Sequence, residues 1–254
     1  MKEIDKKIIL KTEGLTKHYG GVKALDKADF SLQNGEHIAI VGDNGAGKST
    51  FIRQITGVEI PTSGKIYFDG NLVNFKTPSD AKDAGIEAVY QNLALADDLD
   101  VPSNIFLGRE PIKKSLKFLH RLDRNFMYEQ SVDVLESLKI EIPVSSLNQP
   151  VASLSGGQRQ AIAISRAIYW NARILIMDEP TAALGVPEQR KVLELIDTLK
   201  KSSIGIIFIS HNLNDIFSAS DSICVLRQGK KVCEKMISQT NKDEIVSYMV
   251  RGEA

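Results

Sequence analysis

A glycine-rich segment carries the clearest chemical signal in this sequence. Residues 42–50 read GDNGAGKST and fit the spacing G-x-x-x-x-G-K-[ST] of a phosphate-binding loop. Glycines there let backbone N–H groups surround phosphates, and a helix starting near Lys48 adds its positive end. We expect Lys48 to reach the β- and γ-phosphates and the Ser49 hydroxyl to ligate Mg²⁺. The predicted nucleotide contacts are Gly42, Asp43, Asn44, Gly45, Ala46, Gly47, Lys48, Ser49 and Thr50.

Two adjacent carboxylates end a second apolar run, since residues 174–179 read ILIMDE. In nucleotide hydrolases an Asp at such a strand end helps to hold Mg²⁺, the role that we predict for Asp178. Glu179 is then placed to orient and deprotonate an attacking water. Taken alone, the pair would indicate only a solvated strand end. The phosphate-binding loop makes nucleotide hydrolysis the better interpretation.

A second helix start with the chemistry of an anion site lies between these motifs. Residues 154–158 read LSGGQ and open a helix that is expected to run through Trp170. A serine and two glycines at a helix start present free N–H groups to an anion. An ordinary serine cap with a flexible turn explains this motif alone equally well. Within one domain, the two helix starts cannot hold the same γ-phosphate from the same side.

The elements that must position these groups follow an α/β pattern, with short apolar runs between amphipathic stretches. The continuously apolar runs are predicted as buried parallel strands: residues 37–41, 86–90, 173–178 and 205–210. Antiparallel strands are expected before Leu32 and at residues 65–69. Asn-Gly and Asp-Gly pairs at the ends of these strands are turn signals, and residues 223–234 fit a hairpin.

The stretch from about Asn92 to Ser153 lacks strand-like runs and is predicted as a helical insertion. Residues 124–139 show helical spacing of apolar residues, namely Phe126, Val132, Leu135 and Leu138. Another helix is expected from about Pro187, a residue that suits a first helical turn. The predicted fold class is α/β: a P-loop NTPase core with a mixed or parallel sheet, an N-terminal antiparallel β subdomain and a helical insertion subdomain.

We expect a single domain over residues 1–254. Its core would comprise about 1–91 and 154–254, and its helical subdomain about 92–153 plus the helix that follows LSGGQ.

Composition narrows the function further. Hydrophobic residues make up 43% and charged residues 25% of the 254 residues, as in an ordinary globular protein. Thirty-two basic residues balance 32 acidic ones, so the overall charge gives no indication of nucleic-acid binding. The charged N-terminal stretch lacks the apolar core of a signal peptide. The apolar runs are far shorter than the ~20 residues of a membrane-spanning helix, so any membrane role is expected to be peripheral.

Over nearly the whole chain, this sequence resembles the ATP-binding cassette ATPases. The motifs that carry the resemblance are, in order, GDNGAGKST, LSGGQ, ILIMDEP and His211. The resemblance implies head-to-tail dimers in which each ATP lies between the phosphate-binding loop of one subunit and the LSGGQ segment of the other. The residues implied to bind ATP in trans are Ser155, Gly156, Gly157 and Gln158. It also implies that Gln91 contacts Mg²⁺ and the attacking water, and that His211 contacts the γ-phosphate. Tyr19 resembles the aromatic residue that stacks on adenine, with plain strand packing as its alternative.

One position departs from the common family pattern. An Asp usually stands four residues beyond the threonine of the EPT sequence, where this chain has Gly185. The sequence is nevertheless similar to the ATPases of bacterial monosaccharide importers of the ribose, xylose and fructose type. This similarity lies in residues 90–111 and 178–188, and it includes Gly185. That resemblance implies an ATP-dependent homodimer on the cytoplasmic face of the cell membrane. Permease subunits would dock on its helical subdomain, and a solute-binding protein would take part indirectly.

Three other interpretations remain open. A cassette ATPase that exports lipids or drugs would share all of the chemistry. A ribosome- or nucleic-acid-associated cassette is disfavoured by the balanced charge and by the lack of long coiled-coil insertions or paired cassettes, so we expect no nucleic-acid partner. A regulatory module without turnover is disfavoured because Glu179, Gln91 and His211 are all present.

Overall fold

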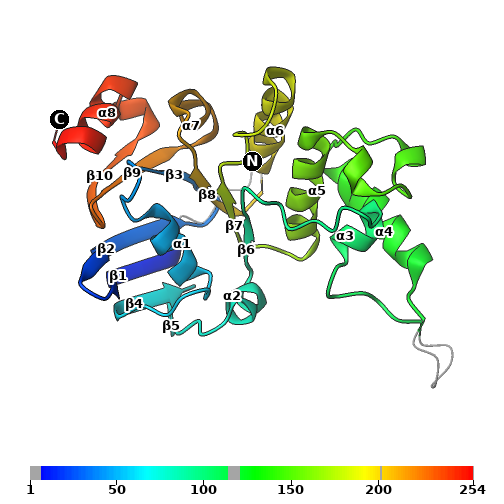
Figure 1. The fold of residues 1–254 in the computed structure, drawn as a ribbon, viewed down its shortest axis with the longest axis horizontal. Coiled ribbons are helices and arrows are strands. Elements are labelled where there is room, and N and C mark those ends of the chain that lie inside the picture. Colours follow the sequence, from blue (N-terminus) through cyan, green and yellow to red (C-terminus); the bar gives the residue numbers. More distant parts are fainter. Residues whose placement is uncertain (1–6, 114–120, 201, 254) are drawn as a thin grey trace.

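The computed structural model describes residues 7–113, 121–200 and 202–253 and contains two β-sheets and a helical region (Figure 1). The first sheet is antiparallel, with strand order β2-β1-β4-β5. Its strands are β1 (Ile8–Tyr19), β2 (Val22–Gln33), β4 (Ser63–Phe68) and β5 (Asn71–Val73). The second sheet has the order β10-β9-β3-β8-β7-β6. Its strands are β3 (His37–Val41), β6 (Ile86–Val89), β7 (Ile174–Asp178), β8 (Gly205–Ile209), β9 (Ser222–Arg227) and β10 (Lys230–Met236).

The second sheet is mixed, because β10 runs antiparallel to β9 while its other neighbouring strands pair in parallel. All five residues of β3 are buried. Ile38 and Ile40 join the hydrophobic core between the two sheets, whereas Ala39 and Val41 join the core on the opposite face. Burial on both faces is why this strand is continuously apolar, as expected for parallel strands that are covered on both sides.

Helix α1 (Lys48–Ile55) directly follows β3 and packs in the core between the sheets. Phe51 and Ile52 of α1 are almost fully buried. The Phe51 ring packs edge-on against Phe30 of β2, with the ring centroids 5.0 Å apart. This packing fixes the helix that starts at Lys48 against both sheets.

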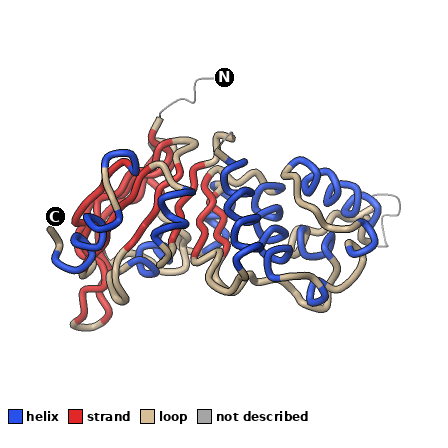
Figure 2. The backbone as a smooth tube through the Cα atoms, turned by 90° about the horizontal axis from the view of Figure 1, so that it is seen from above, coloured by secondary structure: helices blue, strands red, loops and turns tan. Residues whose placement is uncertain are grey.

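The remaining helices cover the second sheet or form the helical region. They are α2 (Pro78–Ala84), α3 (Val101–Ile105), α4 (Arg124–Ser137), α5 (Gly156–Tyr169), α6 (Val186–Leu199), α7 (Leu213–Ala219) and α8 (Lys242–Arg251). Figure 2 shows the strands gathered at one end of the molecule and the helices α3, α4 and α5 toward the other. Helix α5 packs against both α3 and α6, so it links the helical region to the sheet. No helix of the described residues is both long and apolar enough to cross a membrane.

The predicted fold class is confirmed. The strands predicted at 37–41, 86–90, 173–178 and 205–210 end within one residue of β3, β6, β7 and β8. The hairpin predicted at 223–234 is β9 and β10. The boundary between core and helical subdomain stays a prediction.

The helical spacing over residues 124–139 is confirmed by α4, although one of its apolar residues, Phe126, is 42% exposed. The residues of α4 that are buried are Met127, Ser131, Val134 and Leu135. Val132 is only partly buried against the core, and the Phe126 ring lies with its centroid 6.2 Å from that of Phe106. Periodicity therefore located the helix, but the packing of α4 against its neighbours decided which face is buried.

Candidate active site

The loop between β3 and α1 holds the predicted phosphate-binding residues. Gly42 has φ 153°, and a Cβ there would lie 2.2 Å from the Leu226 carbonyl oxygen. Gly47 has φ 106°, and a Cβ there would lie 2.7 Å from the Ala24 carbonyl oxygen. Only glycine fits such a close backbone approach. The loop is therefore packed tightly against the end of β9 and against β2.

The N-terminus of α1 has unsatisfied hydrogen-bond donors. Its N-cap, Gly47, supplies no side-chain hydrogen bond, and no acidic residue stands in the first turn. The free N–H groups and the helix dipole together favour an anion at this point. The Lys48 ammonium donates to the carbonyl oxygens of Gly42 (2.6 Å) and Asp43 (3.1 Å). Ser49 is exposed and Thr50 is half-buried, so both stand at the surface of this loop.

The two acidic residues at the end of β7 lie within the electrostatic reach of Lys48. Burial lowers the pKa of Lys48, and the carboxylates of Glu179 and Asp178 oppose that shift. Burial raises the pKa of Asp178, and the positive charge of Lys48 opposes it. The strand order places β7 next but one to β3, with β8 between them. The carboxyl ends of parallel strands share one edge of the sheet, which is where a ligand is expected to bind.

Glu179 has an uncommon backbone conformation, with φ 53° in the left-handed region. Its N–H donates to the carbonyl oxygen of Ile209, the last residue of β8. His211 Nε2 lies 3.3 Å from Glu179 Oε1. Burial raises the pKa of Glu179, and the nearby His211 opposes the shift. Such strain at the end of a strand is a recurrent feature of catalytic sites.

A cleft of about 230 Å³ brings Gln91 and Glu179 together with Gly156 at the start of α5. The loop after Gln91 is held in place by Arg166 of α5. Its guanidinium donates to the carbonyl oxygens of Ala94 (3.1 Å) and Leu93 (3.3 Å). Helix α5 therefore shapes the wall of the cleft that carries Gln91.

The LSGGQ segment forms a closed cap at the start of α5. Ser155 Oγ accepts a hydrogen bond from the Gln158 N–H (3.3 Å), and Gln158 Oε1 accepts one from the Ser155 N–H (3.0 Å). The two glycines allow close packing: a Cβ on Gly157 would lie 3.2 Å from Glu188 Cβ. Glu188 Oε2 also accepts a hydrogen bond from the Gly185 N–H (3.3 Å). Gly185, where the sequence departs from the common family pattern, is thus the N-cap residue of α6 and lies beside the start of α5.

Sequence reasoning missed a buried hydrogen bond that connects the turn after Glu179 to helix α7. Thr181 Oγ1 donates to Asp215 Oδ2 at 2.7 Å, and both residues are at most 5% exposed. Asp215 belongs to α7, which starts at Leu213, two residues after His211. No local motif reveals this pair, because 34 residues separate its members.

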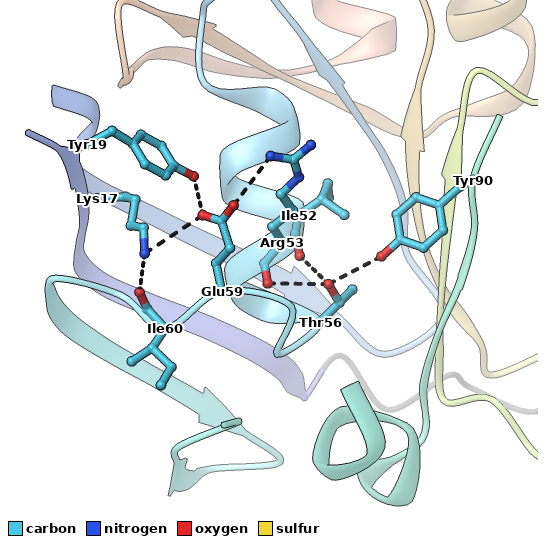
Figure 3. Close-up of polar contacts among 8 residues, drawn as sticks. All are labelled: Lys17, Tyr19, Ile52, Arg53, Thr56, Glu59, Ile60 and Tyr90. Carbon is cyan, nitrogen blue, oxygen red and sulfur yellow. Dashed lines mark hydrogen bonds and ion pairs between the residues drawn. The ribbon is translucent and has the colours of Figure 1, made fainter. Parts of the chain in front are cut away.

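Tyr19 ends β1 and is 43% exposed, which disfavours plain strand packing. Its hydroxyl donates to the carboxylate of Glu59, in the loop between α1 and β4 (Figure 3). Sequence reasoning did not identify Glu59.

The structure thus groups Lys48, Asp178, Glu179 and His211, and it places Gln91 and Gly156 at one cleft with Glu179. Within the described residues, no hydrogen bond or ion pair joins residues 155–158 to the phosphate-binding loop. The individual roles of these side chains stay predictions.

Comparison with known proteins identifies close relatives along the chain. Residues 25–182 match a family model described as ABC transporter. A xylose/arabinose import ATP-binding protein of Sulfolobus acidocaldarius is 45% identical over 241 residues, covering 95% of this chain and 93% of its own. A fructose import ATP-binding protein of Rhizobium meliloti is 44% identical over 243 residues, with coverage of 95% and 93%. A solved structure described as a dimeric bacterial ABC transporter cassette matches with a TM-score of 0.74 and 25% identity, covering 90% of this chain and 99% of that one.

Proposed function

Because this chain belongs to the ATP-binding cassette family of transporter ATPases, we propose that it binds and hydrolyses Mg-ATP as one of two identical cassettes that drive a membrane importer of monosaccharides. The resemblance to the xylose/arabinose and fructose import proteins extends over about 95% of the chain and supports the sugar assignment. The observation that carries the chemistry is the grouping of Lys48, Glu179 and His211 at one edge of the sheet.

Binding of ATP begins at α1. The free N–H groups of residues 42–50 surround the β- and γ-phosphates. Lys48 exchanges its hydrogen bonds to the Gly42 and Asp43 carbonyl oxygens for bonds to phosphate oxygens. The adenine stacks on the exposed ring of Tyr19.

The oxygen donors at this edge fit Mg²⁺. Ser49 offers a hydroxyl, Asp178 a carboxylate and Gln91 an amide oxygen, and Mg²⁺ prefers hard oxygen ligands. Held by these residues, Mg²⁺ would supply positive charge that offsets the negative charge developing on the phosphates during hydrolysis.

Hydrolysis uses Glu179 as the general base. Its carboxylate takes a proton from water while the water oxygen bonds to the γ-phosphorus and the bond to the bridging oxygen of ADP breaks. The raised pKa of Glu179 makes the carboxylate a stronger base than an exposed one. His211, at 3.3 Å, orients that carboxylate and contacts the γ-phosphate, and Gln91 orients the water from the cleft side.

The second anion site, residues 155–158, serves the ATP of the partner subunit. This arrangement is supported by the resemblance to a cassette that is described as dimeric. ATP then bridges two subunits, and loss of the γ-phosphate removes the bridge. Permease subunits dock on the helical region, a solute-binding protein acts outside the membrane, and the ATPase works at the cytoplasmic face.

The first test is the size-exclusion mass of Glu179→Gln with and without Mg-ATP. We expect a monomer without nucleotide and a dimer with Mg-ATP, because ATP is bound but not hydrolysed. A monomer in both conditions, with ATP demonstrably bound, would refute the ATP-bridged dimer of the isolated chain.

A second test addresses the cargo. The ATPase is combined with a candidate monosaccharide permease and its solute-binding protein in vesicles, and turnover is measured with and without sugar. Stimulation by sugar supports import of monosaccharides. Stimulation only with a lipid- or drug-exporting permease would contradict it.

A further inference from the structure

We propose that Glu59 is a positioning residue that ties Tyr19, the predicted adenine-stacking residue, to the helix that binds the phosphates. Glu59 lies outside every motif that the sequence revealed. The inference rests on the proposed function in one respect, that the adenine lies on Tyr19. It adds that the surface for the base and the cradle for the phosphates are held together as one unit.

Three side chains converge on the Glu59 carboxylate (Figure 3). The Tyr19 hydroxyl donates to Glu59 Oε2, and Lys17 Nζ lies 3.8 Å from the same oxygen. Arg53 Nη1 donates to Glu59 Oε1 at 3.3 Å. Tyr19 and Lys17 belong to β1, whereas Arg53 belongs to α1. One carboxylate therefore joins the strand that carries the aromatic ring to the helix that starts at Lys48.

The backbone around Glu59 is anchored to the same two elements. The Glu59 N–H donates to the Arg53 carbonyl oxygen of α1 at 3.0 Å. Lys17 Nζ of β1 donates to the Ile60 carbonyl oxygen at 2.7 Å. The carboxylate is thus presented from a fixed loop, and a site residue is best held by partners that are themselves locked in place.

The Tyr19 ring is only partly buried. It is 43% exposed and stands at the end of β1, directly before Gly20 and Gly21. Lys17 Nζ lies 5.4 Å from the ring centroid. Burial and then the Glu59 carboxylate raise the pKa of Tyr19, so its hydroxyl remains a donor at neutral pH. The hydroxyl–carboxylate hydrogen bond therefore ties the ring to Glu59.

The charges around Glu59 are compatible with a nearby triphosphate. The single carboxylate is accompanied by the cations of Lys17 and Arg53, so the cluster has no net negative charge. Since the cluster does not repel phosphates, the effect expected from removing the Glu59 carboxylate is weaker binding of the base.

The test compares Glu59→Gln, Tyr19→Phe and Tyr19→Ala in the full chain. Affinities for Mg-ATP and for inorganic triphosphate are measured by displacement of a fluorescent ATP analogue. We expect Glu59→Gln and Tyr19→Phe each to weaken ATP binding about 3- to 10-fold, the order of the net contribution of one ordinary hydrogen bond. Triphosphate binding should stay within twofold, because it has no base. The double variant Glu59→Gln/Tyr19→Phe should bind ATP about as weakly as either single variant, because each single substitution already removes the same hydrogen bond.

A matched control exists in the same sheet. The Tyr67 hydroxyl donates to Glu13 Oε2 at 3.2 Å, and Lys11 Nζ donates to Glu13 Oε1 at 2.7 Å. Glu13 lies six residues before Tyr19 on β1, about 20 Å along the strand. Glu13→Gln removes a similar carboxylate far from the base, and ATP affinity should be unchanged.

The outcomes separate this inference from the proposed function. If Tyr19→Ala weakens ATP binding but Glu59→Gln and Tyr19→Phe do not, stacking stands and the positioning role of Glu59 is overturned. Equal weakening of ATP and triphosphate by Glu59→Gln also overturns it, because Glu59 would then act on the phosphate cradle. If Tyr19→Ala leaves ATP affinity unchanged, the assignment of Tyr19 under the adenine fails and the inference fails with it.

Discussion

The two glycine-containing helix starts of this molecule, those of α1 and α5, look alike in sequence but differ in how their donors are used. Helix α1 begins after Gly47 with no side-chain cap, and Lys48 is held by carbonyl oxygens of its own loop. Helix α5 begins with a closed capping box between Ser155 and Gln158. The start of α1 therefore has donors and a cation available for phosphate within one chain. At the start of α5, some of the backbone N–H donors are already hydrogen-bonded to the side chains of the capping box.

From this difference we propose different tasks for the two helix starts. The α1 start is buttressed by β2 and β9 and stands at the sheet edge that holds Asp178 and Glu179. The α5 start is buttressed by α6 through Glu188 and borders the cleft that Gln91 lines. The first is suited to bind the phosphates tightly. The second is suited to a weaker contact that is made when another anion is brought to it.

The largest effect is expected from the α1 side. Lys48→Ala should lower ATP turnover about 10²- to 10³-fold, because one preorganised charge on the phosphates is lost. The measurement is steady-state phosphate release at saturating Mg-ATP. Lys65→Ala, an exposed lysine of β4, is the control and should keep full turnover. Unchanged turnover in Lys48→Ala would remove α1 from the catalytic site.

On the α5 side, Ser155→Arg should abolish the ATP-dependent dimer and lower turnover about 10²-fold, the effect of losing an anion-binding donor at the γ-phosphate. ATP affinity of the single subunit should remain within twofold, because the phosphate-binding loop is intact. The dimer is measured by size exclusion in the Glu179→Gln background, ATP affinity by nucleotide titration, and turnover by phosphate release with Glu179 intact. A loss of ATP affinity as large as the loss of turnover would show that residues 155–158 act within one chain.

The pH dependence of turnover sharpens the assignment of Glu179. Burial raises its pKa and His211 lowers it. A base must be deprotonated to act, so turnover is present above the pKa of Glu179 and is lost as the pH falls through it. His211→Ala removes the opposing charge, so the acid limb of its residual kcat profile should move to higher pH. A limb that stays in place would assign the titration to another group.

The smallest effect concerns the cap of α5. Ser155→Ala removes the side-chain oxygen that accepts from the Gln158 N–H. The free energy of unfolding should fall by about 1 kcal/mol. In a chain of this size that corresponds to a decrease in Tm of about 2–4 °C. Thermal unfolding measures it, and Ser145→Ala, at an exposed serine before the motif, should leave Tm nearly unchanged.

Much of the fold could be predicted from the sequence because the patterns that indicate strands and helices are local. A continuously apolar run such as 37–41 predicts a strand covered on both faces, and β3 is buried at every residue. The helix at 124–137 was located by its spacing, but exposed Phe126 shows that spacing does not decide which side packs inward. The short helices α2 and α7 and the C-terminal α8 were not predicted. Each has a capping residue at its start, Thr77, Asn212 and Asn241, which was the available signal.

The residues of the candidate site also fall into two groups, those that the sequence located and those that only the tertiary structure brought together. The sequence by itself determined the phosphate-binding loop, the carboxylates at the end of β7 and the LSGGQ cap, because backbone conformation over a few residues depends on glycines, caps and apolar neighbours. Only the tertiary structure decided that Tyr19 meets Glu59, that Thr181 meets Asp215 and that Gln91 shares a cleft with Glu179. These partners lie tens of residues apart, and the packing of strands and helices around two cores brings them together.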